Sequence, residues 1–215
     1  MIKAVLLDID GTIRDSRAMI WYSYEQTFKH FNLTTPDKTD LAEHMHAGPE
    51  LCFQHYAPEH DAKELVDYYR SILATVLDKI PAYDGVVQTL RALHGQGIKL
   101  GVVSASKFAR NDLESNGVAS FMDVVIDGHT TVHPKPNPEG ANLALEKLHV
   151  IPEEALMIGD LPADIALGKA ARLGATVAVT YGFGPRALLK AAQPDYIIDN
   201  FPALLGVIAK LNRTA

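Results

Sequence analysis

The sequence predicts an α/β fold in which a parallel sheet is covered by helices on both faces. Three observations support this class. From about residue 97 onward, short apolar runs alternate with amphipathic segments, a pattern typical of parallel strands joined by helices. A similar apolar run at residues 3–7 is typical of a buried strand. Between residues 13 and 96 there is no convincing strand, which predicts a small all-helical block inserted after the first strand.

The N-terminal part is predicted to be mostly helical after the strand at 3–7. Apolar residues recur at helical spacing over residues 17–31, and Ser16 precedes them as the expected N-cap. A polar break at 32–39 follows. Further helices are predicted at residues 40–47, 50–57 and 60–79.

The remaining chain alternates between helices and strands. A helix at 85–95 is stopped by Gly95 and Gly97. Strands are predicted at residues 98–103, 124–126, 155–158, 176–180 and 196–198. Helices are predicted at residues 107–116, 138–149, 162–173, after Pro185 and at 202–212. Right-handed crossovers with short loops would bring the carboxyl ends of these strands to one edge of the sheet.

Composition limits the class of protein. A chain of 215 residues, 47% hydrophobic and 21% charged, suits one globular domain that carries a smaller inserted one. The single cysteine, Cys52, excludes an intramolecular disulfide and is expected to be a small buried residue rather than a nucleophile. No signal-peptide pattern and no long apolar run is present, so a cytoplasmic protein without membrane contact is expected. The net charge of −6 argues against a nucleic-acid partner but not against a small phosphorylated substrate.

Two carboxylates stand where the first predicted strand ends. Asp8 and Asp10 would project the same way if the strand continued, although Gly11 is expected to end it. Like charges at a strand end repel each other unless a cation lies between them, and a divalent metal with oxygen ligands suits such a place. A solvated acidic turn explains the same residues, and this motif alone does not decide between the two.

Polar residues follow the later strands too. In Ser104-Ala105-Ser106-Lys107, a serine hydroxyl and the backbone N–H groups of the turn either form an anion site, or Ser104 or Ser106 simply caps the next helix. Lys135 lies among prolines, where its ammonium either offsets nearby carboxylates and phosphate or is solvated in a rigid turn. Asn137 is expected to cap the helix that Pro138 opens.

A second acidic site follows the strand predicted at residues 155–158. Asp160 lies at the strand end, and Asp164 can lie on the same face of the next helix's first turn. Capping of that helix explains one of these carboxylates but explains two less well. Topology brings Asp8, Ser104, Lys135 and Asp160 to the same edge of the sheet.

This set of motifs resembles the haloacid dehalogenase superfamily of phosphatases and phosphotransferases over essentially the whole chain. Asp8-Ile9-Asp10-Gly11-Thr12 resembles its first motif, Ser104 its second, Lys135 its third, and Gly159-Asp160 with Asp164 its fourth. The helical block, Asp15-Ser16 and Gly182-Phe183-Gly184 are similar to the phosphoglycolate-phosphatase-like and β-phosphoglucomutase-like subgroup. The resemblance implies a Rossmann-like core domain of residues 1–15 and 81–215 and a helical cap domain of residues 16–80.

The resemblance also implies roles for individual residues. Asp8 would be the nucleophile that forms an aspartyl phosphate, and Asp10 the general acid and then the general base. Mg²⁺ would be held by Asp8, by Asp10 through its backbone carbonyl and by Asp160, with Asp164 supporting it. The implied phosphate-binding residues are Ser104, Ala105, Lys135, Gly11 and Thr12.

Some positions differ from the family pattern or have no implied role. Ser104-Ala105-Ser106-Lys107 is similar to the β-phosphoglucomutase type, whereas the fourth motif is more like that of the phosphatases. Arg14 replaces a frequently apolar residue; it could touch a substrate anion, but a surface role is expected. His44, His46 and Gly48 lie where related enzymes carry specificity residues, although histidines on short helices are commonly plain surface or core groups.

The expected function is that of a Mg²⁺-dependent phosphatase acting on a small phosphomonoester, a phosphorylated metabolite. The alternative within enzymes is a phosphomutase of the β-phosphoglucomutase type. A receiver domain that accepts phosphate on an aspartate, or an inactive binding module, is the alternative outside enzymes; the order of the motifs and the complete set of acids argue against both. The sequence leaves the substrate open, and it leaves open whether the protein is a monomer or a homodimer.

Overall fold

A computed structural model of the chain, which describes residues 1–45, 48–75 and 80–214, contains a six-stranded parallel sheet. The strand order is β3-β2-β1-β4-β5-β6, and every neighbouring pair is parallel. The strands are β1 (Ala4–Leu7), β2 (Lys99–Val103), β3 (Val124–Ile126), β4 (Ala155–Gly159), β5 (Ala175–Val179) and β6 (Tyr196–Ile198). The predicted α/β class, with a parallel sheet and helices on both faces, is confirmed.

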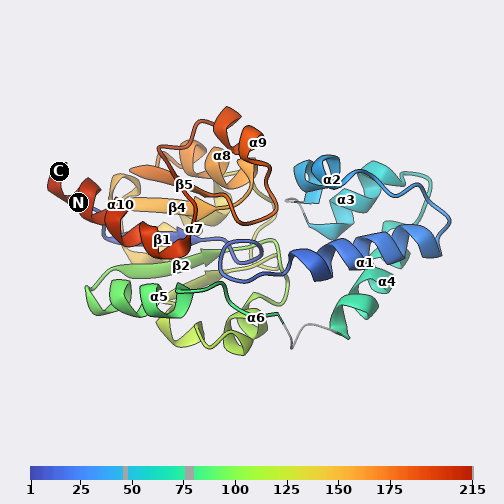
Figure 1. Cartoon of the computed structure of the whole chain (residues 1–215), viewed down its shortest axis with the longest axis horizontal. Helices are drawn as coiled ribbons and strands as arrows, with labels where there is room; N and C mark the ends of the chain where they lie inside the picture. Colours follow the sequence, from blue (N-terminus) through green and yellow to red (C-terminus); the bar gives the residue numbers. More distant parts are fainter. Residues whose placement is uncertain (46–47, 76–79, 215) are drawn as a thin grey trace.

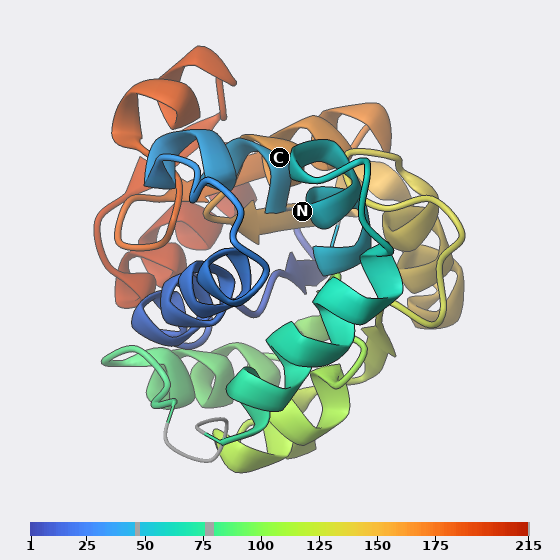
Figure 2. The ribbon, with the colours of Figure 1, turned by 90° about the vertical axis from the view of Figure 1, so that its right-hand side faces the viewer.

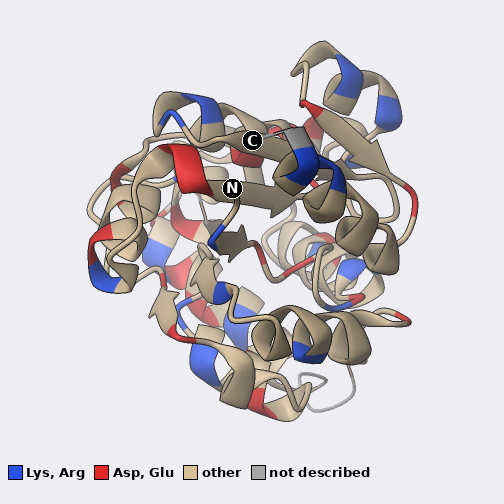
Figure 3. Ribbon diagram, turned by 90° about the vertical axis from the view of Figure 1, so that its left-hand side faces the viewer, with Lys and Arg blue, Asp and Glu red and all other residues tan. Residues whose placement is uncertain are grey.

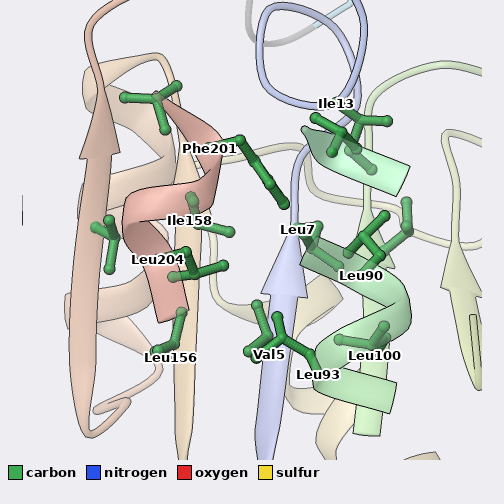
Figure 4. Close-up of a cluster of buried hydrophobic side chains, with 14 of the residues drawn as sticks. Val5, Leu7, Ile13, Leu90, Leu93, Leu100, Leu156, Ile158, Phe201 and Leu204 are labelled. Atoms are coloured by element: carbon green, nitrogen blue, oxygen red, sulfur yellow. The ribbon is translucent and has the colours of Figure 1, made fainter. Parts of the chain in front are cut away.

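Strand β1 occupies the centre of the sheet and is buried on both sides. Val5 lies beside Leu100 of β2 and Leu156 of β4 in the register of the sheet. Because successive side chains of a strand point to opposite faces, Val5 and Leu7 enter one hydrophobic core and Leu6 enters another. Figure 4 shows Val5 and Leu7 among leucines from neighbouring strands and from α5. A continuous apolar run is what such a doubly covered strand needs.

Helices cover both faces of the sheet (Figure 1), and each face has its own cluster of buried hydrophobic residues between strands and helices. One face packs against α5 (Val86–Gly95), α6 (Ala109–Ser115) and α10 (Leu204–Thr214). The opposite face packs against α7 (Glu139–Leu148) and α8 (Pro162–Ala170). The short helix α9 (Arg186–Ala191) covers β5 through Leu189 and Ala178.

Four helices form the helical block at one end of the molecule. They are α1 (Arg17–His30), α2 (Lys38–His44), α3 (Pro49–Tyr56) and α4 (Ala62–Ala74). Figures 1 and 2 show them in front of the sheet's edge, and Figure 2 looks through them toward the strands. The block has its own aromatic core, in which Tyr24 lies 4.7 Å from Tyr69 and Phe28 lies 5.5 Å from Phe53 between ring centroids. Leu161 joins the same cluster from the α/β part, so the block is packed onto the sheet's edge.

The observed elements follow the predicted ones with small differences at their ends. Helix α4 ends at Ala74, whereas the prediction extended to residue 79; residues 76–79 lie outside the described part of the chain. The last helix begins at Leu204, after a 3₁₀ turn at Phe201–Ala203. Cys52 is buried as expected, and burial raises the pKa of its thiol to about 12, so the thiol stays protonated at neutral pH.

The prediction that the Ser16 side chain caps α1 is wrong. Ser16 occupies the N-cap position but makes no side-chain hydrogen bond to the helix, and its hydroxyl oxygen is buried without a hydrogen-bond partner. Its backbone has φ −86° and ψ −1°, which is helical. A capping serine needs extended backbone angles to aim its oxygen at the helix N–H groups.

Acidic and basic residues are distributed around the end of the molecule that lies away from the helical block. Figure 3 views that end, where Lys and Arg are interspersed with Asp and Glu. Among the described residues, none of the helices has the length and apolar character needed to cross a membrane.

We expect Phe53→Ala to lower the free energy of unfolding by about 3–5 kcal/mol, the usual cost of truncating a buried phenylalanine. Phe53 is fully buried in the aromatic core of the helical block. Leu51 lies on the same helix but is 46% exposed, so Leu51→Ala is a matched control with a cost below about 1 kcal/mol. Urea unfolding measures both. Equal losses would contradict a packed core in this block.

Candidate active site

The site lies where the central strands end, at the sheet's edge that faces the helical block. Asp8 follows β1, Ser104 follows β2 and Asp160 follows β4. Because β1 pairs with both β2 and β4, these three residues are brought together although up to 152 positions separate them. The order of strands reverses around β1, and open α/β sheets form their binding crevices at such switch points. Strand β1 ends at Leu7, one residue before Asp8, so Asp10 lies in a loop.

Lys135 lies between two carboxylates. Its Nζ donates hydrogen bonds to Asp8 Oδ1 at 2.5 Å and to Asp164 Oδ1 at 2.7 Å. Burial acts against the charge of this lysine, but Asp164 and Asp8 raise its pKa above the usual value. Lys135 is 8% exposed, so the alternative of a solvated lysine is wrong. The expectation for Asn137 is confirmed, because its side chain accepts the backbone N–H of Glu139 at the start of α7.

Asp8, Asp160 and Asp164 form a buried acidic cluster. One carboxylate oxygen of each lies within 4.8 Å of the others. Burial raises the pKa of Asp8 to about 7, with Lys135 opposing the rise. Burial also raises the pKa of Asp160 well above its usual value, and the negative charges of Asp8 and Asp164 raise it further. The acidic-turn alternative for Asp8 is wrong, since a solvated turn residue is not 6% exposed.

The donors around Asp160 leave its charge poorly balanced. Its Oδ2 accepts the Phe183 backbone N–H at 2.6 Å, and its Oδ1 faces the Thr12 hydroxyl at 3.4 Å, both neutral groups. Lys135 hydrogen bonds to the other two carboxylates of the cluster. When all three buried carboxylates are ionised, the one ammonium leaves excess negative charge at one point. Oxygen ligands with uncompensated charge fit a hard divalent cation such as Mg²⁺.

Asp164 has two functions in the structure. Its Oδ2 accepts the backbone N–H of Leu161 at 3.0 Å and so caps α8. Its other oxygen accepts the hydrogen bond from Lys135. Asp164 therefore caps α8 and also belongs to the buried acidic cluster.

The loop after Asp10 packs tightly against Asp160. Gly11 has φ +81°, and a Cβ atom there would lie 2.2 Å from Asp160 Oδ2. The N–H of Gly11 donates to Arg14 O, and the N–H of Thr12 donates to Ile9 O. Thr12 is fully buried with its hydroxyl directed at Asp160. The loop thus positions Asp160.

Arg14 is buried between two carboxylates, so the expected surface role is wrong. Its Nε donates to Asp10 Oδ1 and one terminal nitrogen donates to Asp112 Oδ1, both at 2.7 Å. The residue is 2% exposed. Burial acts against its charge, but Asp10 and Asp112 raise the pKa of the guanidinium. The other oxygen of Asp112 accepts the Ser106 hydroxyl at 2.8 Å.

Ser104 follows β2 and is 7% exposed. Its hydroxyl oxygen accepts the backbone N–H of Ser106 at 3.1 Å. Helix α6 begins only at Ala109, and the backbone N–H just before it, that of Phe108, donates to the Ser106 hydroxyl oxygen at 3.1 Å. The helix-capping alternative is therefore wrong for Ser104, whereas Ser106 binds the backbone at the start of α6. Ala105 follows Ser104 at the wall of the cavity described next.

A cavity of about 120 Å³ lies above these residues and beneath the helical block. Asp8, Asp10, Ser104 and Lys135 contribute polar groups to it. The helical block contributes mainly apolar and aromatic side chains, Ile20, Tyr24, Met45, Tyr69 and Leu73. Arg70 and Lys107 also line it, and both donate to Glu50 Oε1 at 2.7 Å.

The helical-block positions suggested for specificity have different environments. Gly48 lines the cavity. The ring of His44 instead stacks on His55 at 3.9 Å between centroids and lies 3.0 Å from the Tyr56 hydroxyl. His44 is thus held within the helical block, as the plainer interpretation expected. His46 lies outside the described residues.

Sequence reasoning missed several residues of the site. The Phe183 N–H was not linked to Asp160, although the Gly-Phe-Gly motif drew attention to that loop. Asp112 gave no local signal, because it is an ordinary helical aspartate in the sequence. Glu50 was equally unmarked, and only the fold shows that it accepts hydrogen bonds from both Arg70 and Lys107.

Comparisons with known proteins show the family and the fold. A family model described as haloacid dehalogenase-like hydrolase matches residues 5–179. A protein named pyrophosphatase PpaX from Listeria monocytogenes is 34% identical over 214 residues, covering 96% of each chain. A crystal structure described as a predicted phosphatase from Clostridium acetobutylicum superposes with a TM-score of 0.84 at 26% identity, covering 98% of this chain and 99% of that one.

One further structure shares the fold at lower identity. The β-phosphoglucomutase of Clostridium difficile has a TM-score of 0.86 at 22% identity, and the match covers 100% of this chain and 99% of the other. The similarity spans both the sheet and the helical block.

We expect Gly11→Ala to lower the free energy of unfolding more than Gly97→Ala does. Both glycines have positive φ, +81° and +76°, so each substitution carries backbone strain of about 1–2 kcal/mol. Only Gly11 is also crowded, and displacing Asp160 should add about 1–3 kcal/mol, as for other overpacked sites. Urea unfolding of the two variants measures the difference. Equal costs would mean that the loop can move away from Asp160 freely.

Proposed function

Because this chain belongs to the haloacid dehalogenase-like hydrolase family, we propose that it is a Mg²⁺-dependent phosphatase that forms an aspartyl phosphate on Asp8. The family resemblance and the phosphatase class of hydrolase predicted from the motifs are confirmed. The observation that carries the finer proposal is the Asp8 carboxylate, held by Lys135 in an acidic cluster at the base of a covered cavity. This arrangement suits phosphoryl transfer, which depends chiefly on positioning and charge neutralisation.

The proposed reaction has two steps. An Asp8 oxygen attacks the phosphorus in line with the ester oxygen, the P–O bond to that oxygen breaks, and Asp10 gives its proton to the leaving alkoxide. Asp10, now ionised, then takes a proton from water, and the resulting hydroxide attacks the phosphorus of the aspartyl phosphate. Inorganic phosphate leaves and Asp8 is restored. Lys135 and Ser104 would hold the phosphoryl oxygens.

The acidic cluster supports a site for Mg²⁺. We propose that Asp8, the backbone carbonyl of Asp10 and Asp160 hold the ion, with Asp164 supporting them. The ion, when bound, would neutralise charge on the transferred phosphoryl group. Lys135 would keep Asp164 in place through the hydrogen bond seen here.

We also propose that residues 16–80 act as a cap domain on a core of residues 1–15 and 81–215. The helical block lies over the cavity and supplies its apolar wall, which supports exclusion of water during the first step. Admission of water in the second step would require the cap to move.

The substrate class proposed is a small phosphorylated metabolite. A cavity of about 120 Å³ supports a leaving group of few atoms. A relative at 34% identity is named a pyrophosphatase, so pyrophosphate belongs in a substrate screen together with phosphoglycolate, sugar phosphates and nucleoside monophosphates. Release of one inorganic phosphate for each ester consumed separates hydrolysis from transfer to a second hydroxyl.

We expect the protein to hydrolyse p-nitrophenyl phosphate with Mg²⁺ and to lose this activity with EDTA. Asp8→Asn keeps the side-chain shape but removes the nucleophile, so turnover should fall by about 10³-fold or more. Asp67→Asn, at an exposed ion pair of α4, is the matched control and should leave the rate unchanged. Nitrophenolate release measures all three proteins. Normal turnover by Asp8→Asn would exclude an aspartyl phosphate on Asp8.

We expect Mg²⁺ to raise the Tm more at pH 8 than at pH 5.5. In the metal-free protein the pKa of Asp8 is raised to about 7, so protonation of Asp8 favours the folded state. This contribution to stability is lost as the pH rises through that value. Mg²⁺ needs the ionised carboxylate, so its binding strengthens over the same interval. At 100 times Kd the gain would be about 2.7 kcal/mol, or roughly 5–10 °C for a chain of this size.

Thermal unfolding with and without Mg²⁺ measures this effect, with Asp160→Asn as the variant that should lose it. Asp67→Asn again serves as the control. An equal Mg²⁺ shift in Asp160→Asn and the unaltered protein would place the ion elsewhere.

A further inference from the structure

We propose that Arg14 is a positioning residue that fixes the carboxylate of Asp10 for proton transfer to the leaving group. The proposal rests on the function proposed above, in which Asp10 is the general acid. It goes beyond the family resemblance, because Arg14 stands where that family frequently has an apolar residue.

The hydrogen bonds around Asp10 point to this role. The Asp10 side chain is 23% exposed, and its Oδ1 accepts from Arg14 Nε at 2.7 Å. Within the described ranges, Arg14 is the donor that the structure places on this carboxylate. A carboxylate with one anchored oxygen has a defined orientation, and its second oxygen is left for the reacting group. The anchor and Asp10 both line the cavity.

Arg14 is itself anchored from the far side. A terminal nitrogen donates to Asp112 Oδ1, and Asp112 Oδ2 accepts the Ser106 hydroxyl. Ser106 in turn donates its backbone N–H to the hydroxyl oxygen of Ser104. A continuous series of hydrogen bonds thus connects the proposed general acid after β1 with the proposed phosphate ligand after β2. Asp10, which would act on the leaving oxygen, and Ser104, which would hold the phosphoryl group, are therefore positioned relative to each other by the same hydrogen bonds.

Stability alone gives a poor account of this buried arginine. Replacing a buried ion pair with apolar residues is commonly neutral or stabilising, because desolvation offsets the attraction between the charges. The loop also holds its shape through the backbone, since Arg14 O accepts the Gly11 N–H and Arg14 N donates to Ile9 O. These bonds do not need the guanidinium. The planar guanidinium can instead contact two carboxylates at fixed angles, as Arg14 contacts Asp10 and Asp112 here.

The role predicts a dependence on the leaving group. Proton donation by a general acid matters when the leaving oxygen is strongly basic and matters little when it is weakly basic. Phenyl phosphate and p-nitrophenyl phosphate have the same aryl shape, but phenolate is much the more basic leaving group. The parameter kcat/KM reports the first chemical step, transfer to Asp8, for both esters.

We expect Arg14→Leu to lower kcat/KM for phenyl phosphate by about 10²-fold, the cost of a misplaced catalytic group. For p-nitrophenyl phosphate the loss should be below about fivefold, because general-acid help contributes little there. Arg14→Lys should show the same selectivity, since an ammonium cannot reproduce the two-way fork. Asp112→Asn should give a smaller selective loss. Circular dichroism and Tm establish which variants fold, and any folded one of the three carries the test.

Arg17→Leu is the matched control. Arg17 lies three residues after Arg14 and pairs with Asp15 near the surface. The variant should leave kcat/KM for both esters unchanged. Equal losses on the two esters in the folded variants, or no loss on either, would overturn the positioning role. If the unaltered protein hydrolysed neither ester, the proposed phosphatase function would fail first.

Discussion

The contact on which the site depends is the ammonium of Lys135 between Asp8 and Asp164. Lys135 comes from the loop between β3 and α7, Asp8 from the end of β1, and Asp164 from the first turn of α8. A buried lysine with two carboxylates recovers part of the solvation that each group loses on folding. The balance remains incomplete, because Asp160 adds a third buried carboxylate. The chain therefore folds into a site with a remaining demand for positive charge, which is the property that a cation-binding site needs.

The sheet makes this contact possible. Strand β1 is central and pairs with β2 on one side and β4 on the other, so the residues after all three strands share one edge. Helices on both faces bury those strands except for Lys99 at the start of β2. Above that edge, the helical block closes the cavity with aromatic and aliphatic side chains. Polar groups at the strand ends, covered by mainly apolar side chains of the helical block, suit chemistry that must exclude water in one step and admit it in the next.

Much of this could be predicted from sequence, because its causes are local or topological. Apolar runs predict strands, strand–helix alternation predicts parallel pairing, and parallel pairing brings Asp8, Lys135 and Asp160 together. Ser16 failed as a cap because residue preference does not determine backbone angles, which here are helical. Arg14 was misplaced at the surface because its partner Asp112 lies 98 positions away in a helix without a distinguishing motif. Pairings of that kind depend on packing that no short window contains.

Membership of the hydrolase family accounts for the motif residues of the site but not for the side chains that the helical block contributes to the cavity. Motif residues line the cavity at the sheet's edge. The helices that line its other side have no motif from which their role could be predicted. His44 illustrates the difference, since its ring is held within the helical block by His55 and Tyr56. Specificity must therefore be sought in cavity-facing side chains such as Tyr69 and Leu73.

Glu50 of α3 accepts hydrogen bonds from Arg70 of its own block and from Lys107 of the α/β part. Swinging α3 outward would break only the second of these pairs, and the carboxylate would keep a cationic neighbour throughout the movement. The side chains of this pair are 34% and 36% exposed, and pairs near the surface contribute about 0–1 kcal/mol, so the contact can break and reform readily. If the helical block moves as proposed, a contact of that strength would favour the closed position without preventing the entry of solvent.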